Sequence, residues 1–207
     1  MADHLGSPLL EFIRRWLPGP PARVLDVGCG NGELTRRLRG LGYRAIGVDP
    51  DAPAQPGFER VAVEELRCER QFDAAVALRS LHHIGALDRA VAALASCLPP
   101  GSRLVVFEFA VESLDGASER WLRDRRLTPP ITAEHRDEIL AFAEVDAALS
   151  PAFKRILREP APYLAREAGR PKLEAAEEEA IAAGSLPAAG VRAVYELRAA
   201  RVTAPSG

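Results

Sequence analysis

Apolar residues follow two different spacings along the chain. Continuous apolar runs occur near 23–27, 44–48, 60–63, 72–78 and 103–109, separated by segments that have a helical spacing or none. Short continuous runs are typical of strands buried on both faces of a sheet, whereas helices repeat apolar residues every three or four positions. The alternation predicts βαβ units around a mainly parallel sheet.

The helices predicted between these runs are uneven. Ser7-Pro8 offers an N-cap followed by proline at the first helical position, so a helix is expected from there to Leu17. Two more are predicted over 33–41 and 87–98. The segment 51–57 holds two prolines and a glycine, which predicts a loop or a single turn where a second crossover helix normally lies.

The pattern changes after Phe109. An arginine-rich stretch and a helix expected over 132–148 are interpreted as an insertion over the active face. A strand is predicted at 153–157. The helix at 173–183 is strongly acidic, and its carboxylates predict an exposed surface because burying several of them is costly. Alternating residues at 191–197 are typical of a half-exposed strand, expected to pair antiparallel with its predecessor.

Length and composition predict one globular domain. The 207 residues are 47% apolar and 27% charged, which is ordinary globular usage. Within this domain we expect an N-terminal helix at 1–20 and a ligand-binding core at 20–110. A lid that includes the sixth strand is expected at 110–190, and the last strand at 190–200.

The charge balance disfavours nucleic acid as a partner. The formal net charge is -2, so the chain has no overall attraction to phosphate backbones. No apolar stretch reaches the roughly 18 residues needed to cross a bilayer, and the first residues lack the basic-then-apolar order of a signal peptide. We therefore expect a cytoplasmic protein without a membrane partner.

The three cysteines, Cys29, Cys68 and Cys97, are an odd number and include no Cys-x-x-Cys pair. This spacing indicates neither a disulfide framework nor a structural zinc site, and it is consistent with a reducing compartment. Cys29 lies between two glycines, where a small residue tolerated in a tight turn is favoured over a reactive thiol.

The most informative segment joins the first apolar run to the next helix. Val24-Leu25-Asp26-Val27 leads directly into Gly28-Cys29-Gly30-Asn31-Gly32, and the second run closes with Asp49. Because glycine lacks a Cβ, this loop is expected to place bare backbone N–H groups where a ligand can approach. The carboxylate of Asp49 is expected to accept hydrogen bonds from both hydroxyls of a ribose. Together they predict a nucleoside-binding half-site.

Two classes of protein place a glycine loop after the first strand and an acid after the second. The dinucleotide-binding fingerprint G-x-G-x-x-G requires glycine at position 33, where this chain has Glu33. The charge of Glu33 also opposes a pyrophosphate at the helix N-terminus. A cationic ligand suits the acids of this segment better.

The order Asp26-x-Gly28-x-Gly30-x-Gly32 resembles that of class I S-adenosylmethionine-dependent methyltransferases. Three later segments match the same family in order: 72–77 resembles its fourth strand, 81–84 the loop and helix start that follow, and 98–106 the turn into its fifth strand. The resemblance covers roughly residues 20–110 well and the remainder weakly. It implies a Rossmann-like α/β fold with a seven-stranded, mainly parallel sheet, an antiparallel final hairpin and helices on both faces.

The resemblance also implies how S-adenosylmethionine is held. Asp26 would face the ammonium group of its methionine part, Gly28, Cys29 and Gly30 would cradle the cofactor, and Asp49 would hold the ribose.

The adenine end of the implied site is less regular. Leu78, at the end of the fourth strand, belongs to the expected cofactor-binding set. Ala62 occupies the position where the family often has an aspartate for the adenine amino group. Either Glu64 substitutes for that aspartate, or the adenine is held by backbone and apolar contacts alone.

Three residues are candidates for catalysis. His82 and His83 are considered because an imidazole near neutral pH takes a proton from a nucleophile, although adjacent residues do not both face the cofactor from one helical turn. Glu108, near the carboxyl end of the fifth strand, is either a ligand-facing or a buried structural carboxylate.

The predicted function is methyl transfer from S-adenosylmethionine to an unidentified acceptor, for which a small molecule is favoured and no metal is required. An RNA or protein acceptor would be favoured if the arginines around Trp121 faced the cofactor pocket; a solvated helix face is their other interpretation. These arginines are Arg120, Arg123, Arg125 and Arg126. A non-catalytic cofactor-binding protein and an NAD-dependent oxidoreductase are the alternatives from other classes.

Overall fold

A seven-stranded sheet organises the computed structural model, which describes residues 7–68, 72–128 and 139–199. The strand order is β3-β2-β1-β4-β5-β7-β6; the pairs from β3 to β5 are parallel, and β7 runs antiparallel to both β5 and β6. This is the predicted Rossmann-like fold with an antiparallel final hairpin. The strands are β1 (Arg23–Val27), β2 (Arg44–Val48), β3 (Phe58–Glu59), β4 (Ala74–Leu78), β5 (Arg103–Phe109), β6 (Phe153–Ala161) and β7 (Gly190–Leu197).

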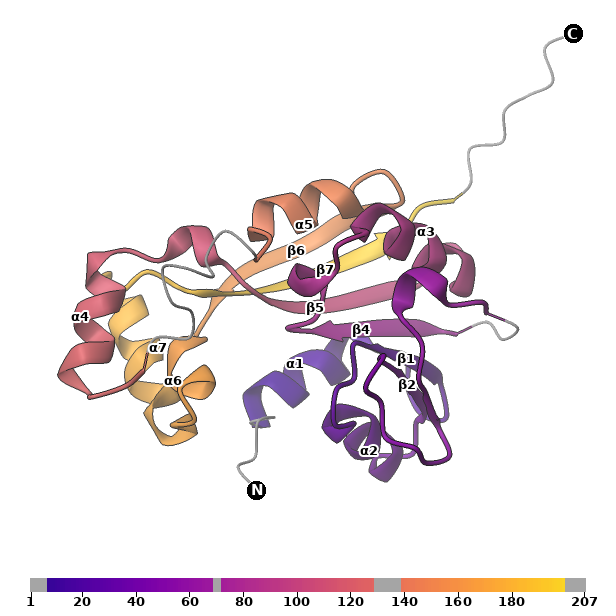
Figure 1. Cartoon of the computed structure of the whole chain (residues 1–207), viewed down its shortest axis with the longest axis horizontal. Helices are drawn as coiled ribbons and strands as arrows, with labels where there is room; N and C mark the ends of the chain where they lie inside the picture. Colours follow the sequence, from indigo (N-terminus) through magenta and orange to yellow (C-terminus); the bar gives the residue numbers. More distant parts are fainter. Residues whose placement is uncertain (1–6, 69–71, 129–138, 200–207) are drawn as a thin grey trace, which may run out of the picture.

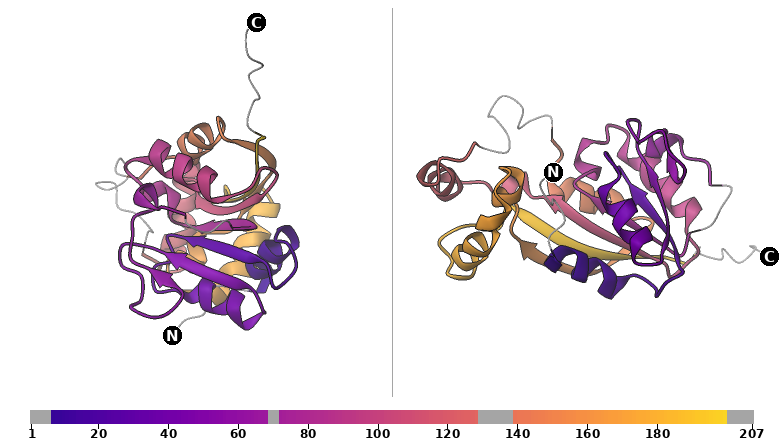
Figure 2. Two further views of the ribbon diagram at one scale, coloured as in Figure 1. Left: turned by 90° about the vertical axis from the view of Figure 1, so that its right-hand side faces the viewer. Right: turned by 90° about the horizontal axis from the view of Figure 1, so that it is seen from below.

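Helices cover both faces of the sheet (Figure 1). The helices are α1 (Ser7–Trp16), α2 (Glu33–Gly40), α3 (Leu87–Cys97), α4 (Gly116–Asp124), α5 (Phe142–Leu149), α6 (Leu164–Glu167) and α7 (Glu174–Ala182). Helices α1 and α2 lie on one face, and α3 and α5 lie on the other. The long strands β5 to β7 carry α4, α6 and α7 beyond the N-terminal half (Figures 1 and 2).

Two apolar clusters, one on each face, explain why the internal strands read as continuous apolar runs. In β1, Leu25 and Val27 pack toward α3, while Val24 packs toward α1 and α2. Successive strand residues point to opposite faces, so a strand covered on both sides requires apolar residues at almost every position. The helices predicted from Ser7, over 33–41 and over 87–98 are confirmed as α1, α2 and α3.

The strand predicted at 60–63 is wrong. The third strand is the two-residue β3, whose pairing with β2 ends where the N–H of Asp49 donates to the carbonyl of Glu59 at 3.2 Å. The chain then leaves the sheet edge and forms the 3₁₀ turn η1 (Val63–Glu65), which buries Val63 against the core. The apolar run near 60–63 therefore reflects packing of a turn under the sheet edge.

The C-terminal half also differs from the prediction. Within the described part of the segment 132–148, the helix begins only at Phe142; residues 132–138 lie outside the described residues. Strand β6 extends four residues beyond the predicted Leu157. Strand β7 is almost entirely buried, because it lies between β5 and β6 and its residues reach both apolar clusters.

The acidic helix α7 is not a uniformly exposed surface, which corrects the prediction for two of its residues. Glu177 is fully buried and accepts hydrogen bonds from the N–H groups of Tyr163, Leu164 and Ala165 at 2.7, 2.9 and 2.7 Å. Glu174 pairs with the buried Arg166. The carboxylate of Glu177 satisfies amides at the start of α6 that have no partner within so short a helix.

Cys68 and Cys97 form a disulfide, so the expectation of no disulfide is wrong. Their Cα atoms lie 5.2 Å apart, within the range that a disulfide requires. Cys68 follows η1 and Cys97 ends α3, and the cysteines meet because η1 packs against α3. Within the described residues, no helix is long and apolar enough to cross a membrane.

Candidate functional site

A cavity of about 640 Å³ opens at the carboxyl ends of the parallel strands. It lies beside the reversal of strand order between β1 and β4, the position where open α/β sheets bind ligands. The cavity has a carboxylate end, defined here by Asp26 and Asp49, and an aromatic end, defined by Phe107, Phe109 and Tyr163. All the predicted cofactor-binding residues line it: Asp26, Gly28, Cys29, Gly30, Asp49, Glu64 and Leu78.

The loop between β1 and α2 has a backbone conformation and a close packing that favour glycine. Gly28 and Gly30 have φ of 65° and 49°, in the left-handed region that glycine adopts without penalty. A Cβ on Gly28 would lie 2.3 Å from the Cβ of Ser80, so the loop after β4 fixes glycine at this position. A Cβ on Gly30 would meet no atom within 4 Å, which leaves open space beside the backbone.

The loop amides do not serve as bare donors, which corrects the prediction. The N–H groups of Gly28 and Cys29 donate to the carbonyl of Val48 at 2.9 and 3.1 Å. The N–H of Gly30 donates to Oδ2 of Asp49 at 3.0 Å. The loop therefore gives a ligand close approach to the backbone, and its amides bind the end of β2 and orient the acid that follows.

Asp49 is held in place from two sides. Oδ2 accepts from Gly30, and Oδ1 accepts from the N–H of Asp51 at 2.8 Å. The half-buried carboxylate lines the cavity. Each carboxylate oxygen accepts more than one hydrogen bond, so Asp49 retains capacity for two hydroxyls of a ligand.

Asp26 is a buried acid that has no basic partner among the described residues. It is 2% exposed, and the hydroxyl of Thr35 donates to its Oδ2 at 2.5 Å. Burial, reinforced by the charge of nearby Asp49, raises the pKa of Asp26 to about 6 against the hydrogen bonds from Thr35 that lower it. A cationic group bound here would relieve this cost of charging the carboxyl.

The carboxylate end carries a net negative charge. Among the described residues, neither Asp26 nor Asp49 forms an ion pair, and Glu33, at the start of α2, lines the same end. Such a site repels a pyrophosphate and attracts a cation. The residues therefore fit an ammonium-bearing nucleoside better than a dinucleotide.

The remaining predicted cofactor residues surround these acids. Glu64 lies on η1 and lines the cavity together with Ala62 and Val63. Leu78, the last residue of β4, lines the cavity from the sheet. Cys29 is buried, and burial, with the charges of Asp26 and Asp49, raises the pKa of its thiol to about 12. The thiol is therefore protonated at neutral pH, as expected for a small loop residue rather than a reactive group.

The catalytic candidates form a buried hydrogen-bonded group. Glu108 is fully buried, and its Oε1 accepts from the N–H groups of Ser80 and Leu81 at 2.9 and 2.7 Å. Its Oε2 contacts Nδ1 of His82, which is 3% exposed and lines the cavity. His83 also lines the cavity with an exposed side chain. The pKa of His83 is lowered, mainly by partial desolvation and to a smaller extent by the charge of the neighbouring His82.

The aromatic end was missed in the sequence. Tyr163 stacks on Phe109 with ring centroids 4.5 Å apart and planes 9° from parallel. Beside them, the guanidinium of Arg79 bonds the carboxylate of Glu167 at 2.7 Å. Arg79 follows β4, Phe109 ends β5, Tyr163 precedes α6 and Glu167 ends α6. No local sequence pattern marks residues that meet across such separations.

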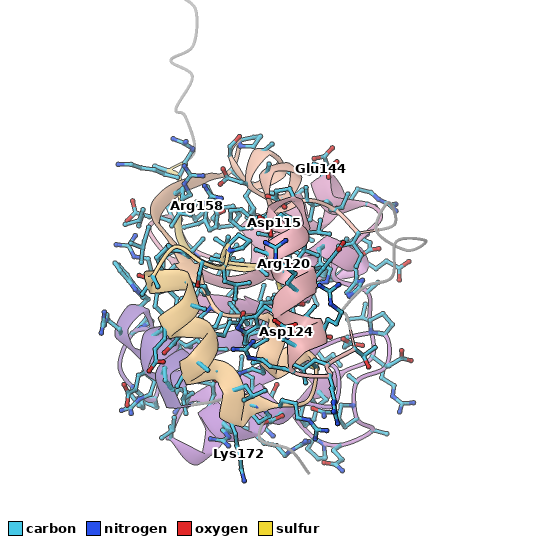
Figure 3. All side chains as sticks on the ribbon, turned by 90° about the vertical axis from the view of Figure 1, so that its left-hand side faces the viewer. Asp115, Arg120, Asp124, Glu144, Arg158 and Lys172 are labelled. Atoms are coloured by element: carbon cyan, nitrogen blue, oxygen red, sulfur yellow. A yellow bond between two sulfur atoms is a disulfide. The ribbon has the colours of Figure 1, made fainter. Side chains whose placement is uncertain are left out.

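Residues of the predicted lid contribute part of the cavity lining. Leu9, Ile139, Tyr163 and Glu167 line the cavity from the N-terminal helix and from 110–190. The arginine cluster on and after α4 does not line it; its side chains are exposed, and Arg125 lies over the ring of buried Trp121 at 4.3 Å. Figure 3 shows Arg120 on α4, seen from the left-hand side of Figure 1. The solvated-face interpretation is confirmed.

The chain belongs to the methyltransferase domain family, whose model matches residues 1–142. It is 31% identical over 117 residues to a ubiquinone biosynthesis O-methyltransferase of Xanthomonas axonopodis, a match that covers 49% of each chain. It is 38% identical over 104 residues to an uncharacterized methyltransferase of Mycobacterium bovis, covering 44% of this chain and 52% of that protein. The chain thus spans about half the length of the curated relatives it matches.

Solved structures share the fold. A putative methyltransferase from an antibiotic biosynthesis pathway of Anabaena variabilis has a TM-score of 0.67 at 16% identity, covering 94% of this chain and 98% of that one. The 1,6-didemethyltoxoflavin-N1-methyltransferase of Burkholderia thailandensis, solved with S-adenosylhomocysteine, has a TM-score of 0.58 at 22% identity, covering 87% and 73%. With the family match, these structures confirm the class I S-adenosylmethionine-dependent methyltransferase fold.

Proposed function

We propose that this protein transfers a methyl group from S-adenosylmethionine to a small molecule. The observation that carries the proposal is the pair of acids without basic partners, Asp26 and Asp49, beside an open glycine loop. When bound, S-adenosylmethionine supplies an electrophilic methyl group on a positively charged sulfur. The protein's task is then to align the methyl acceptor with that group and exclude water.

The proposed contacts with the cofactor lie along the carboxylate end of the cavity. Asp26 binds the ammonium group of the methionine part, and Asp49 binds the ribose hydroxyls. Gly28, Cys29 and Gly30 provide the surface against which the methionyl and ribose parts lie. The adenine lies between Glu64 and Leu78, with Ala62 leaving room where a longer side chain would intrude.

A small methyl acceptor is supported by the lining of the aromatic end. Among the described residues, the lid contributes Leu9, Ile139, Tyr163 and Glu167 to the cavity, Glu167 is paired with Arg79, and the arginine cluster lies elsewhere. An RNA or a protein segment would require a basic or extended surface at the cavity mouth. Two similar proteins, a ubiquinone biosynthesis O-methyltransferase and a 1,6-didemethyltoxoflavin-N1-methyltransferase, are named for small molecules.

Calorimetric titration with S-adenosylmethionine, S-adenosylhomocysteine and NAD tests the proposal. We expect binding of the first two only. Asp49→Ala is expected to weaken both by about 5- to 150-fold, since stranding polar groups costs about 1–3 kcal/mol. Asp51→Ala removes an exposed acid two residues away and is the matched control, expected to bind as the wild type does.

Three results would contradict parts of this proposal. A preference for NAD would show that the cofactor is a dinucleotide and not S-adenosylmethionine, because the carboxylate end would then hold a pyrophosphate. Equal affinity of the wild type and Asp49→Ala would remove Asp49 from the ribose site. Binding of S-adenosylmethionine without turnover on any small-molecule panel would leave a cofactor-binding protein in place of an enzyme.

A further inference from the structure

The His82–Glu108 pair is built as a positioned base. Both oxygens of Glu108 already accept hydrogen bonds, Oε1 from two backbone amides and Oε2 at Nδ1 of His82. A carboxylate that only accepts selects the imidazole tautomer with hydrogen on Nδ1. The other ring nitrogen, Nε2, then carries a free lone pair.

Nε2 of His82 has no hydrogen-bond partner among the described residues. Because His82 lines the cavity while Glu108 lies behind it, the lone pair is available to a bound molecule.

The surroundings of this nitrogen favour a flat, uncharged partner. Phe109 meets the His82 ring edge-on at 6.4 Å and stacks on Tyr163, which makes a continuous aromatic wall. Among the described residues at this end, Arg79, which follows β4, and Glu167, the last residue of α6, carry opposite charges and form an ion pair. Aromatic rings stack on such walls at offset or edge-to-face distances of about 4.5–7 Å.

We infer that the methyl acceptor is a phenol-type hydroxyl and that His82 is the base that deprotonates it. The inference rests on the proposed function. The acceptor oxygen forms a bond to the methyl carbon as the carbon–sulfur bond breaks; the bond electrons stay on sulfur, which leaves as a neutral thioether, and the hydroxyl proton moves to Nε2 of His82.

The strength of the base selects the hydroxyl. A phenol has an ordinary pKa of about 10, whereas an aliphatic hydroxyl is close to water at about 15.7. A neutral side-chain base therefore removes the proton of a phenol far more readily than that of an aliphatic hydroxyl. A thiolate acceptor already carries its lone pair and needs no base.

Methyl transfer to phenols of graded acidity tests this assignment. The panel runs from catechol to a nitrophenol already ionised at the assay pH, with S-adenosylhomocysteine formation as the readout. In His82→Gln, transfer to catechol should fall by about 10²- to 10⁴-fold. Transfer to the ionised nitrophenol should stay within about tenfold of the wild type, since it needs no base. Glu108→Gln should show the same selective loss, smaller in size.

A spectroscopic measurement gives a readout independent of turnover. The nitrophenol is bound to the protein loaded with S-adenosylhomocysteine, and its phenolate absorption is followed with pH. The bound phenol should ionise at a lower pH in the wild type than in His82→Gln. Far-UV circular dichroism of each variant shows that the fold is retained.

The outcomes separate the inference from the proposed function. Equal losses on catechol and the ionised nitrophenol, or a selective loss in His83→Gln instead of His82→Gln, overturn His82 as the base. Methylation of thiols or amines but of no phenol overturns the acceptor class while leaving methyl transfer intact. Failure of the wild type to bind S-adenosylmethionine overturns the proposed function itself.

Discussion

The two ends of the cavity are built in opposite ways. The carboxylate end comes from the loops that follow the neighbouring strands β1 and β2, and its acids have no basic partners among the described residues. The aromatic end joins residues far apart in the chain, such as Arg79 and Glu167, which are 88 positions apart, and its charges are paired. This difference fits the two proposed roles, in which one end binds the cationic cofactor and the other holds the ring of the methyl acceptor.

Asp26→Asn is expected to give the largest effect, because it removes the unpaired buried charge. The folded pKa of about 6 lies above the ordinary 3.8, so the unliganded wild type loses stability as pH rises from 3.8 to 6, on the order of 3 kcal/mol in total. The variant should not show this loss. Denaturant unfolding at pH 4 and pH 7 measures it.

The same substitution should weaken ligand binding. The wild type is expected to lose affinity for S-adenosylhomocysteine as pH falls through about 6, since protonated Asp26 no longer attracts the ammonium group. Asp26→Asn should bind more weakly at pH 7, and its affinity should not carry this pH dependence. A variant that is neither more stable nor weaker in binding would show that Asp26 does not meet a cation.

Glu177→Gln tests the aromatic end, and its expected effect is of intermediate size. Its carboxylate holds three amides at residues 163–165, and the substituted amide group leaves at least one without an acceptor, at a cost of about 1–3 kcal/mol. Phenol binding should weaken, while S-adenosylhomocysteine binding remains. Glu178→Gln, an exposed neighbour, serves as the control and should alter stability by less than about 0.5 kcal/mol. A parallel loss of both ligands would mean that the two ends do not act separately.

Glu167→Gln should give the smallest change. The Arg79–Glu167 pair is about one third exposed, and such pairs contribute less than about 1 kcal/mol. Losing it leaves Arg79 with an uncompensated charge beside the aromatic wall, so KM should fall for an anionic phenol relative to a neutral one. Steady-state kinetics with a matched pair of phenols measures this shift; an unchanged ratio would exclude the pair from selecting the methyl acceptor.

The carboxylate end was predictable from sequence because its determinants are local. An apolar run, a glycine loop and an acid closing the next strand lie within one βαβ unit, and parallel pairing brings Asp26 and Asp49 to the same edge. The role of the amides was not predictable in the same way. Gly28, Cys29 and Gly30 use their N–H groups within the protein, a result that depends on how β2 ends.

The aromatic end, the disulfide and the buried Glu177 escaped prediction for one reason. Tyr163 meets Phe109, Cys68 meets Cys97 and Glu177 meets residues 163–165 only after distant segments have packed. Composition misled in the last case, since an acidic run normally predicts a solvated face. Here one carboxylate of that run satisfies backbone amides that would otherwise be buried without a partner.

A crystal structure of the protein with S-adenosylhomocysteine and catechol tests the central claim most directly. We predict the amino group of the nucleoside at Asp26, its ribose hydroxyls on Asp49, and the catechol oxygen within hydrogen-bond distance of Nε2 of His82, with its ring along Phe109 and Tyr163. A nucleoside bound away from both acids would contradict the account of the cavity. A catechol seated elsewhere would contradict the assignment of its aromatic end.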